Sequence, residues 1–505
     1  MTRTFSFLLG LCVAAVSFAP LQAAEANEEG YKQIFNGKDL SGWDGDPKFW
    51  SVTNGTLHGQ TTAENPTKGN TFIIWRDGTV DDFELKFSYR IVGGNSGMQY
   101  RSKDMGNWVV GGYQGDFEAG TTYSGILYEE RGRGILAQRG QKTIVNEDGK
   151  PEVVEKVGDS AEIQAAIKKE DWNEYHITAR GNRVIHRING RVTADVTDND
   201  TDKRPSSGIL ALQLHAGPPM VVQAKDIRLK RLKLADKKKV VMVAGTPSHG
   251  PGDHEFNAGV QLLHKCLQNQ PGVLSTFYLN GYPKDPTAFD NADTVMVFAD
   301  GGGGHPFIKE DRLQKLSSVF DKGVGFVAVH YGVEVPKEQG GKEFLNWMGG
   351  YFETHYSVNP HWVADFKQIP QHPITRGVKP FSIKDEWYYN MRFQPDMKGV
   401  TPILTAVPPE DTLSRPDGPH SGNPHVRAMK GKPQHVAWAY ERPNGGRGFG
   451  LTGAHHHKNW NEPSFRKVVL NALLWTAKAE VPANGVECEL TEEDLTKNLD
   501  PKGRK

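Results

Sequence analysis

The chain has 505 residues, and its 60 lysines and arginines balance its 60 aspartates and glutamates. A formal charge of zero argues against nucleic acid or an anionic membrane surface as a partner, because both select basic proteins. Of the three cysteines, only Cys266 and Cys488 lie outside the N-terminal segment, which excludes a disulfide framework and a thiolate metal cluster. The length suits two domains, or three, with ordinary buried cores.

Residues 1–24 have the pattern of an export signal. Arg3 precedes an apolar run over residues 5–19, and small residues follow up to Ala24. The run is short for a bilayer span, and no later stretch is long and apolar enough for a membrane helix. We therefore expect a periplasmic or secreted protein without a membrane span.

Residues 25–235 indicate a domain of antiparallel strands. Over residues 82–91 apolar and polar side chains alternate, which is the period of a half-buried strand. Asn189-Gly190 between apolar residues predicts a hairpin. Many short strands with Gly and Asn turns favour a β-sandwich or jelly roll, with one short helix near residues 161–169.

Three predicted strands of this half carry pairs of polar residues on one face. The pairs are Gln99 and Arg101, Gln114 and Asp116, and Gln213 and His215. A plain solvated sheet face is the alternative interpretation, but such a face usually carries Lys, Glu and Thr. We expect these residues to line one concave surface that binds a ligand.

Several ordered motifs resemble the 3-keto-disaccharide hydrolase domain family, which has a concanavalin-like jelly-roll fold. They are residues 33–43, the turn Asn95-Ser96-Gly97, residues 112–116 and residues 212–215. The chain departs from the commoner pattern at Gly115 and in an insert at residues 129–134, which suggests a subgroup with another substrate.

The resemblance implies cleavage of a glycosidic bond beside a 3-keto sugar. The ketone makes the C2 proton acidic, so the bond at C1 can break by elimination, followed by hydration. The expected catalytic residues are Asp116 or His215 as base, Glu129 or His215 as acid, and Arg101 as the clamp for the enolate. The expected sugar-binding residues of this half are Asn95, Gln99, Gln114 and Gln213.

Residues 236–480 predict an α/β domain, followed by a tail over residues 481–505. Continuous apolar runs at residues 240–244, 294–298 and 325–329 are typical of buried parallel strands. Helical patterns alternate with them, at residues 256–267, 309–321 and 463–477. This alternation predicts a sheet with helices on both sides.

Ligands of such sheets bind beyond the carboxyl ends of the strands, where most histidines of the chain fall. A divalent metal could be held by His249, His254 and His455. Sugar hydrogen bonds are expected from His330, His355, Asp385 and Glu386. Loop roles without chemistry are the remaining alternative, and a divalent metal is the one cofactor that the sequence suggests.

This half resembles the ThuA-like (trehalose-utilisation) family, which has the flavodoxin-like fold of class I glutamine amidotransferases. The motifs are Ser248-His249-Gly250, Asp253-His254-Glu255, residues 325–330, Asp385-Glu386-Trp387-Tyr388 and residues 445–448. His330 stands where amidotransferases carry their cysteine, which excludes thiol chemistry. The half also lacks the glycine fingerprint of nicotinamide binding.

Together these patterns predict an exported carbohydrate-active hydrolase whose sandwich domain cleaves a glycosidic bond of a (3-keto-)disaccharide. The alternative is a carbohydrate-binding sandwich joined to a sugar-processing or sugar-binding α/β domain, without glycosidase activity. Binding sandwiches use exposed aromatic platforms, for which Trp43, Trp50, Trp75 and Trp108 are the candidates; burial of these tryptophans in the core is the alternative interpretation.

Overall fold

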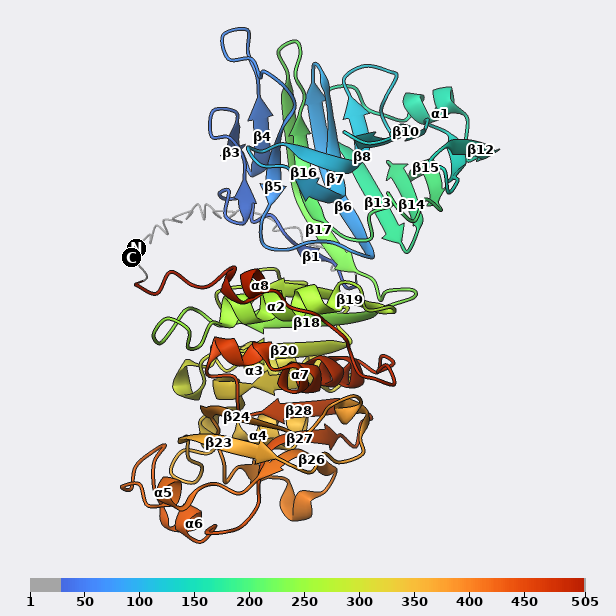
Figure 1. Ribbon diagram of the computed structural model, residues 1–505. Coiled ribbons are helices and arrows are strands. Elements are labelled where there is room, and N and C mark those ends of the chain that lie inside the picture. The colour runs from blue at the N-terminus through green and yellow to red at the C-terminus, as the bar shows by residue number, and fades with distance from the viewer. Residues whose placement is uncertain (1–28, 504–505) are drawn as a thin grey trace, which may run out of the picture.

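The computed structural model describes residues 29–503, so the predicted export signal lies outside the described residues. A sandwich of two sheets forms one domain and an α/β sheet forms the other (Figure 1). The larger sheet of the sandwich contains, in spatial order, β12 (Pro151–Lys156), β11 (Gln141–Val145), β15 (Arg191–Asp198), β14 (Arg183–Ile188), β13 (Asn173–Arg180), β6 (Phe83–Val92), β17 (Val221–Arg231), β4 (Thr56–Gln60) and β3 (Trp50–Thr53), with β1 (Lys32–Gln33) beside β17. The smaller sheet contains β10 (Gly134–Ala137), β9 (Leu127–Glu130), β8 (Val110–Glu118), β7 (Asn95–Asp104), β16 (Ile209–Leu214), β5 (Thr71–Trp75) and β2 (Trp43–Asp44).

The inner faces of both sheets form one apolar core, which explains the alternation in the sequence. From Phe83 to Ile91 of β6 the apolar side chains are buried and the polar ones are half-buried, as the period of two requires. Asn189-Gly190 joins β14 to β15, so the predicted hairpin is present. The expected helix is shorter than predicted, since α1 (Ser160–Ala165) ends at Ala165.

The α/β sheet has five parallel strands and two antiparallel ones. Their spatial order is β19 (Val273–Tyr278), β18 (Lys238–Ala244), β20 (Thr294–Phe298), β21 (Gly325–Val329), β28 (Arg447–Leu451), β27 (Gln434–Glu441) and β26 (Val400–Ala406). Small sheets pair β22 (Gly350–Tyr351) with β25 (Arg392–Phe393), and β23 (His361–Phe366) with β24 (Phe381–Glu386). The predicted strands at 294–298 and 325–329 match β20 and β21 residue for residue.

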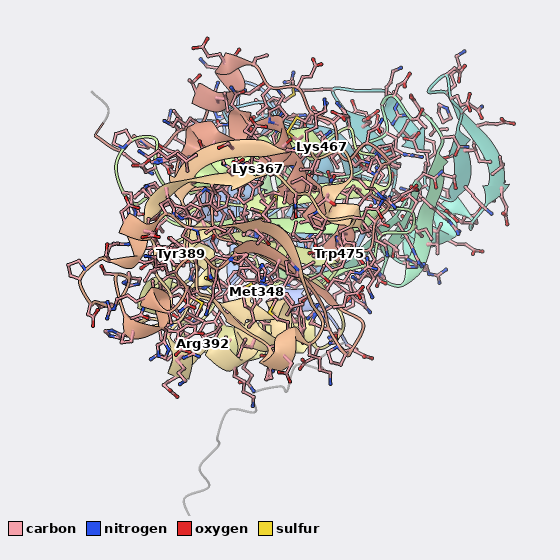
Figure 2. All side chains as sticks on the ribbon, turned by 60° about the horizontal axis from the view of Figure 1, so that its bottom comes forward. Met348, Lys367, Tyr389, Arg392, Lys467 and Trp475 are labelled. Atoms are coloured by element: carbon pink, nitrogen blue, oxygen red, sulfur yellow. A yellow bond between two sulfur atoms is a disulfide. The ribbon has the colours of Figure 1, made fainter. Side chains whose placement is uncertain are left out.

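Helices cover both faces of this sheet, as the alternating pattern predicts. One face packs against α2 (Phe256–Leu267) and α7 (Pro463–Thr476), and the other against α3 (Arg312–Phe320) and α4 (Gly341–Met348). Met348 of α4 and Trp475 of α7, both labelled in Figure 2, are buried on opposite faces. The domain also contains the short α-helices α5 (Glu410–Leu413), α6 (Pro424–Arg427) and α8 (Glu492–Thr496), together with several short 3-10 helices. Over residues 29–503, none of the helices has the length and apolar character needed to cross a membrane.

Charged side chains are buried where the two domains meet. Asp81, in the loop before β6, pairs with Lys239 of β18 and accepts a hydrogen bond of 2.8 Å from Asn291 Nδ2. Arg231 Nη2, at the end of β17, lies 2.7 Å from Asp285 Oδ2. Because buried ions need partners, this network fixes how β18 sits beneath the sandwich.

The segment after α7 returns to the α/β domain and is tied to it. A disulfide joins Cys488 to Cys266 of α2. The sequence analysis excluded a framework of several disulfides, and this single bond is compatible with that prediction. Further on, the Asp500 amide donates to Glu255 Oε2 at 2.8 Å, and Lys502 Nζ donates to the His254 carbonyl at 3.0 Å. The last described residues therefore support the loop that precedes α2.

Candidate functional site

Side-chain amides form a continuous hydrogen-bonded row on the outer face of the smaller sheet of the sandwich. Gln99 Nε2 donates to Gln114 Oε1 at 2.8 Å, and Gln114 Nε2 donates to Asp116 Oδ1 at 2.7 Å. Gln213 lies beside them, with its Oε1 3.4 Å from Gln114 Nε2. The structure thus brings together four of the residues that the sequence placed on one face.

The row can form because Gly97 has no side chain. A Cβ atom at Gly97 would lie 2.4 Å from Gln114 Cγ, so the Gln114 side chain occupies the space above this glycine. Gly115 has the same function on the inner face, where the Tyr175 hydroxyl would lie 2.8 Å from an added Cβ. The two glycines let the strands carry close-packed side chains on both faces.

Asp116 has an unusual environment for a carboxyl group. Its side chain is buried, and this burial, together with the nearby charge of Glu130, raises its pKa to about 8, although Gln114 and Asn95 donate to it and oppose the shift. A carboxyl group that titrates near neutral pH can accept and release a proton during a reaction. Asp116 is therefore the strongest acid–base candidate of this face.

Arg101 does not lie on this face, which corrects the expected clamp. A register shift between Tyr100 and Lys103 breaks the alternation, and Arg101 has a φ of 48°. Its guanidinium is buried and lies 2.7 Å from Asp82 Oδ1. Arg101 therefore stabilises the sandwich near the domain junction.

Glu129 also points away from the amide row. It is buried on the inner side of β9, where its Oε2 accepts a 2.6 Å hydrogen bond from Arg133 Nε. Its neighbour Glu130 lies on the outer face, where Gln213 Nε2 is 3.4 Å from its Oε2. The carboxylate that accompanies Asp116 is thus Glu130, which the sequence reasoning missed.

His215 follows β16 and is half-buried, with its Nδ1 donating to the Ala216 carbonyl at 2.6 Å.

The tryptophans proposed as an aromatic platform are mostly internal. Trp43, Trp50 and Trp75 are buried, while half-buried Trp108 donates its indole hydrogen to Asp44 at 2.9 Å.

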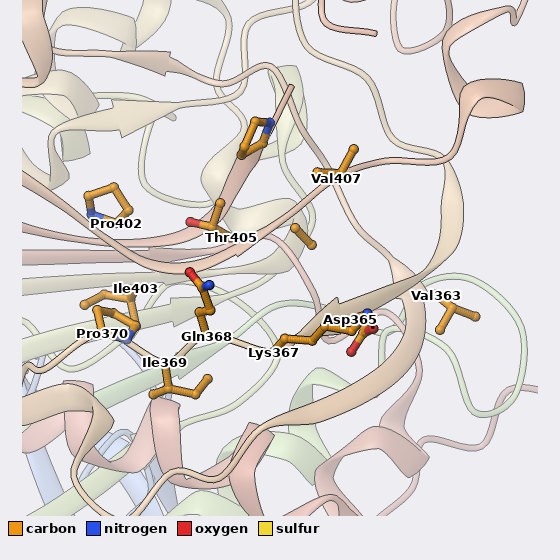
Figure 3. Close-up of a pocket in the computed structure, with 12 residues that line it drawn as sticks. Val363, Asp365, Lys367, Gln368, Ile369, Pro370, Pro402, Ile403, Thr405 and Val407 are labelled. Carbon is orange, nitrogen blue, oxygen red and sulfur yellow. Dashed lines mark ion pairs between the residues drawn. The ribbon is translucent and has the colours of Figure 1, made fainter. Parts of the chain in front are cut away.

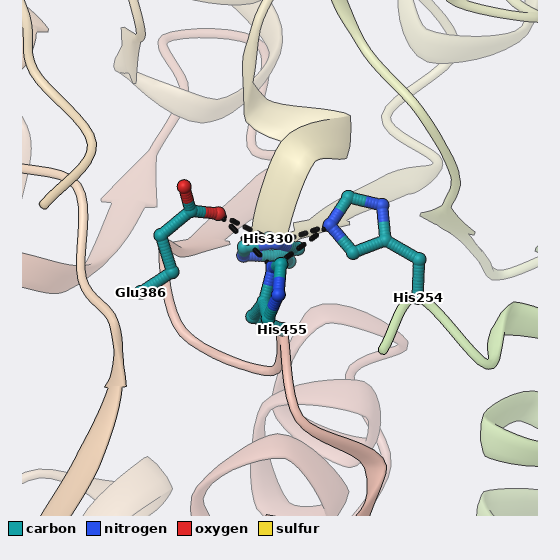
Figure 4. Close-up of side chains that lie close together, drawn as sticks. All are labelled: His254, His330, Glu386 and His455. Carbon is teal, nitrogen blue, oxygen red and sulfur yellow. Dashed lines mark hydrogen bonds and ion pairs between the residues drawn. The ribbon is translucent and has the colours of Figure 1, made fainter. Parts of the chain in front are cut away.

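In the α/β domain, four side chains converge at the carboxyl ends of the parallel strands (Figure 4). His254 Nε2 lies 3.0 Å from both His330 Nε2 and His455 Nδ1. Glu386 Oε2 is 3.1 Å from His455 Nδ1 and 3.5 Å from His330 Nε2. We call His254, His330, Glu386 and His455 the histidine cluster; all four are buried.

Each side chain of the histidine cluster comes from a different part of the fold. His254 lies in the loop between β18 and α2, His330 directly follows β21, and His455 follows β28. Glu386 is the last residue of β24, a strand outside the main sheet. The cluster therefore occupies the edge where α/β sheets bind ligands.

Burial and neighbouring charges set the protonation of these groups. Burial and the adjacent histidines lower the pKa of His330 well below its usual value, and burial also lowers that of His254. Burial opposes charge at His455 too, but the hydrogen bond and charge of Glu386 raise its pKa. The rings of His254 and His330 are thus neutral at pH 7 and have a free lone pair.

Only part of the expected site of this half lies in the cluster. His249 is exposed and stacks on His254 with ring centroids 3.6 Å apart, so it lies at the rim. His355 is exposed and lies outside the cluster. Asp385 is buried and accepts the amides of Ala454 at 2.8 Å and His455 at 3.0 Å. Asp385 therefore positions the loop of His455, while Glu386 and His330 join the cluster itself.

A separate hollow of about 830 Å³ lies between β23 and β26 (Figure 3). Its lining includes Val363, Ile369 and Val407, with Asp365 and Lys367 as its charged residues. It contains no histidine and none of the predicted site residues. This hollow is therefore separate from the histidine cluster.

Two family comparisons cover nearly all of the described chain. Residues 30–230 match a family described as the 3-keto-alpha-glucoside-1,2-lyase-like domain, and residues 239–476 match the trehalose-utilisation family. Both resemblances drawn from the motifs are confirmed. The first half is a sandwich-like domain made mostly of sheet, and the second half is ThuA-like. No curated protein matches the chain.

Solved structures resemble each half separately. A candidate glycosyl hydrolase from Parabacteroides distasonis is 18% identical, covers 40% of this chain and 99% of its own, and has a TM-score of 0.28. The carbohydrate-binding module CBM66 from Bacillus subtilis is 16% identical over 37% and 95%, with a TM-score of 0.25. A candidate ThuA-like protein from Bacteroides uniformis is 15% identical over 48% and 94%, with a TM-score of 0.36.

Proposed function

We propose that this chain, which joins a 3-keto-α-glucoside-1,2-lyase-like domain to a trehalose-utilisation domain, cleaves the glycosidic bond of a 3-keto-disaccharide or related glycoside. The reaction takes place on the amide row of the sandwich, with Asp116 as the base. Both families concern carbohydrate metabolism, so the two halves support one class of substrate. The single observation that carries the proposal is the buried carboxyl of Asp116 at the end of the amide row, where its Oδ1 lies 2.7 Å from Gln114 Nε2.

The chemistry needs one proton acceptor and one proton donor. The Asp116 carboxylate removes the proton at C2, which the ketone at C3 acidifies, and the electron pair of the C2–H bond forms the C1=C2 double bond. The C1–O bond breaks, and its oxygen leaves with a proton. Water then adds across the double bond and gives the free keto sugar. Glu130 or His215 would supply the proton to the leaving oxygen.

The environment of Asp116 suits this role. A base with a pKa near the working pH combines a useful ionised fraction with a strong attraction for the proton. Gln99, Gln114 and Gln213 surround it with amide groups that can hold sugar hydroxyls once their mutual hydrogen bonds open. Arg101 is buried against Asp82, so amide donors of the row take its expected role and stabilise the negative charge that develops on the C3 ketone oxygen.

The test compares the intact protein with its Asp116→Asn variant on 3-keto-trehalose and on unoxidised trehalose. We expect turnover of the 3-keto sugar only. Its kcat/KM should rise with pH and level off, and the midpoint of the rise should lie near the Asp116 pKa of about 8. In the Asp116→Asn variant, kcat/KM should fall roughly 10²–10⁴-fold. The exposed control Asp202→Asn should have the kcat/KM of the unaltered protein. Full activity of Asp116→Asn, or cleavage of trehalose alone, would refute the assignment.

The second candidate function is carbohydrate binding without catalysis by the sandwich. Burial of Trp43, Trp50 and Trp75 removes most of the aromatic platform that this function would use. It would be favoured if Asp116→Asn bound the sugar as tightly as the unaltered protein while neither form produced any product.

We also infer export and a finer fold class for each half. The disulfide between Cys266 and Cys488 supports export, because such bonds persist in oxidising compartments. Two facing sheets with an extended core support the jelly-roll class. The strand order β19-β18-β20-β21-β28 corresponds to the order 2-1-3-4-5 of flavodoxin-like sheets.

A further inference from the structure

The hydrogen bonds around the histidine cluster leave two nitrogen lone pairs facing each other. The Thr452 carbonyl can only accept, so at 2.9 Å it fixes the proton of His330 on Nδ1. The Asp300 carboxylate, 2.9 Å from His254 Nδ1, fixes the proton of that ring in the same way. Both Nε2 atoms are then bare, yet they lie only 3.0 Å apart. Such a contact is repulsive unless a cation lies between the rings.

The spacing of the ligand atoms fits one ion. Zinc bonds of about 2.0–2.1 Å to nitrogen or oxygen in a tetrahedron place the ligand atoms about 3.3 Å from one another. The separations in the cluster are 3.0 Å twice, 3.1 Å and 3.5 Å, and all four atoms lie within 4.8 Å of one another. Three imidazoles and one carboxylate are also a ligand set that suits zinc and its neighbours.

Each ligand side chain also contacts a second partner that fixes its orientation, as is usual for metal ligands. Besides the partners of His330 and His254, Glu386 Oε1 accepts from Asn359 Nδ2 at 3.0 Å. Asp253 Oδ2 lies 3.5 Å from the outer nitrogen of His455. These partners orient the rings and the carboxylate toward one point.

The backbone is strained where it presents these side chains. His254 has a φ of 47°, His330 has a φ of 54°, and Ala454, just before His455, has a φ of 92°. A residue with a side chain in this region costs on the order of 1–3 kcal/mol, and such residues concentrate at functional sites. Three of the four ligands thus depend on backbone in this strained region.

We propose that His254, His330, Glu386 and His455 bind one divalent transition-metal ion of the zinc type in the α/β domain. The proposal stands on this domain alone and does not depend on the activity of the sandwich. Two other groups could compete for the ion, one through His249 and Asp300 and one through Asp253 and His456. Both groups include exposed or half-exposed residues. They use His254 Nδ1 and His455 Nε2, the ring nitrogens that do not face the other ligands of the histidine cluster.

The location of the ion indicates what it would bind. The Tyr388 hydroxyl lies 3.4 Å from both His330 Nε2 and Glu386 Oε2, directly beside the ligand atoms. Exposed His249 and His361 contact the rings of His254 and His455 and form the rim. A metal ion beneath such a rim can polarise a carbonyl or hydroxyl oxygen of a sugar.

The experiment measures metal content by plasma mass spectrometry on the full-length protein, purified after growth with added zinc, manganese and cobalt. We expect about one ion per chain, and loss of that ion in His330→Ala and in Glu386→Gln. Glu386→Gln keeps the size of the side chain and is the safer variant for folding. The matched control His249→Ala should keep the ion. Asp300→Asn, which weakens the support of His254 without removing any of the four ligands, should weaken affinity for the ion about 10–100-fold.

A second measurement is independent of variants. Protein stripped with a chelator should gain several degrees in melting temperature when zinc is restored, because the ion binds only the folded state. Absence of metal from every preparation together with an unchanged melting temperature would overturn the proposal. Retention of the ion by both His330→Ala and Glu386→Gln, or its loss from His249→Ala alone, would do the same. Metal content is read without any sugar turnover, so failure here is distinct from failure of the sandwich activity.

Discussion

The unusual pKa of Asp116 has a measurable cost for stability. Its carboxyl has a pKa of about 8 in the folded protein, against 3.8 for an unperturbed group. Between these pH values the folded state keeps a proton that the unfolded state has released. Stability therefore falls as pH rises, by about 1.4 kcal/mol per pH unit. From pH 5 to pH 8 the loss amounts to about 3–4 kcal/mol.

Asp116→Asn should abolish this loss, because an amide stays neutral and can still accept from Gln114. The assay is the melting temperature of the sandwich between pH 5 and pH 8, for the unaltered protein and the variant. Their difference should change by on the order of 10 °C across this range, with the variant gaining as pH rises. Asp202→Asn should follow the unaltered protein. Parallel curves for Asp116→Asn would show that Asp116 ionises normally and would refute the reasoning.

Three further predictions concern neighbouring features. Glu130→Gln removes a charge that helps to raise the carboxyl pKa, so the pH-dependent loss of melting temperature should end at a lower pH. Gly97→Ala places a Cβ 2.4 Å from Gln114 Cγ; we expect about 10–100-fold slower turnover of a 3-keto glycoside with an unchanged circular dichroism spectrum. Lys239→Met leaves Asp81 buried without its lysine and should lower the free energy of unfolding in urea by about 3–5 kcal/mol. Adding Asp81→Asn to this variant should restore part of that loss. An unchanged unfolding midpoint in Lys239→Met would contradict a role of the pair in stability.

The architecture could be predicted because its signals are local. Apolar and polar residues that alternate with a period of two predict β6, and continuous apolar runs predict β20 and β21. Both patterns follow directly from which face of a strand is buried. The limits of α1 could not be predicted to the residue, since a short helix has few periodic positions.

The sandwich site was predictable only where the strands are regular. Gln114 and Asp116 share a face because β8 alternates through them. Arg101 lies within an irregularity of β7 that reverses the faces, and such a bulge has no clear sequence signal here. Glu129 could have been placed correctly, because buried Leu127 two residues earlier points to the same side.

The histidine cluster was predictable as a location and not as a ligand set. The sequence placed several histidines after parallel strands, where they must gather at one edge of the sheet. Which ring atoms face inward depends on loop backbones, and the strained conformations of His254 and His330 are not encoded in any periodic pattern. The use of Asp385 to hold two backbone amides is likewise a property of the folded loop.

The segment after α7 gives the histidine cluster a remote dependence. Lys502 holds the carbonyl of His254, and the Asp500 amide is held by Glu255, while Cys488 fixes the same segment to α2. The trehalose-utilisation match ends at residue 476, so a protein trimmed there would keep its sheet and its ligand residues. Its His254 loop would nevertheless lose this outer support. Proteolytic trimming or reduction of the disulfide would thus act on the cluster from outside the domain that carries it.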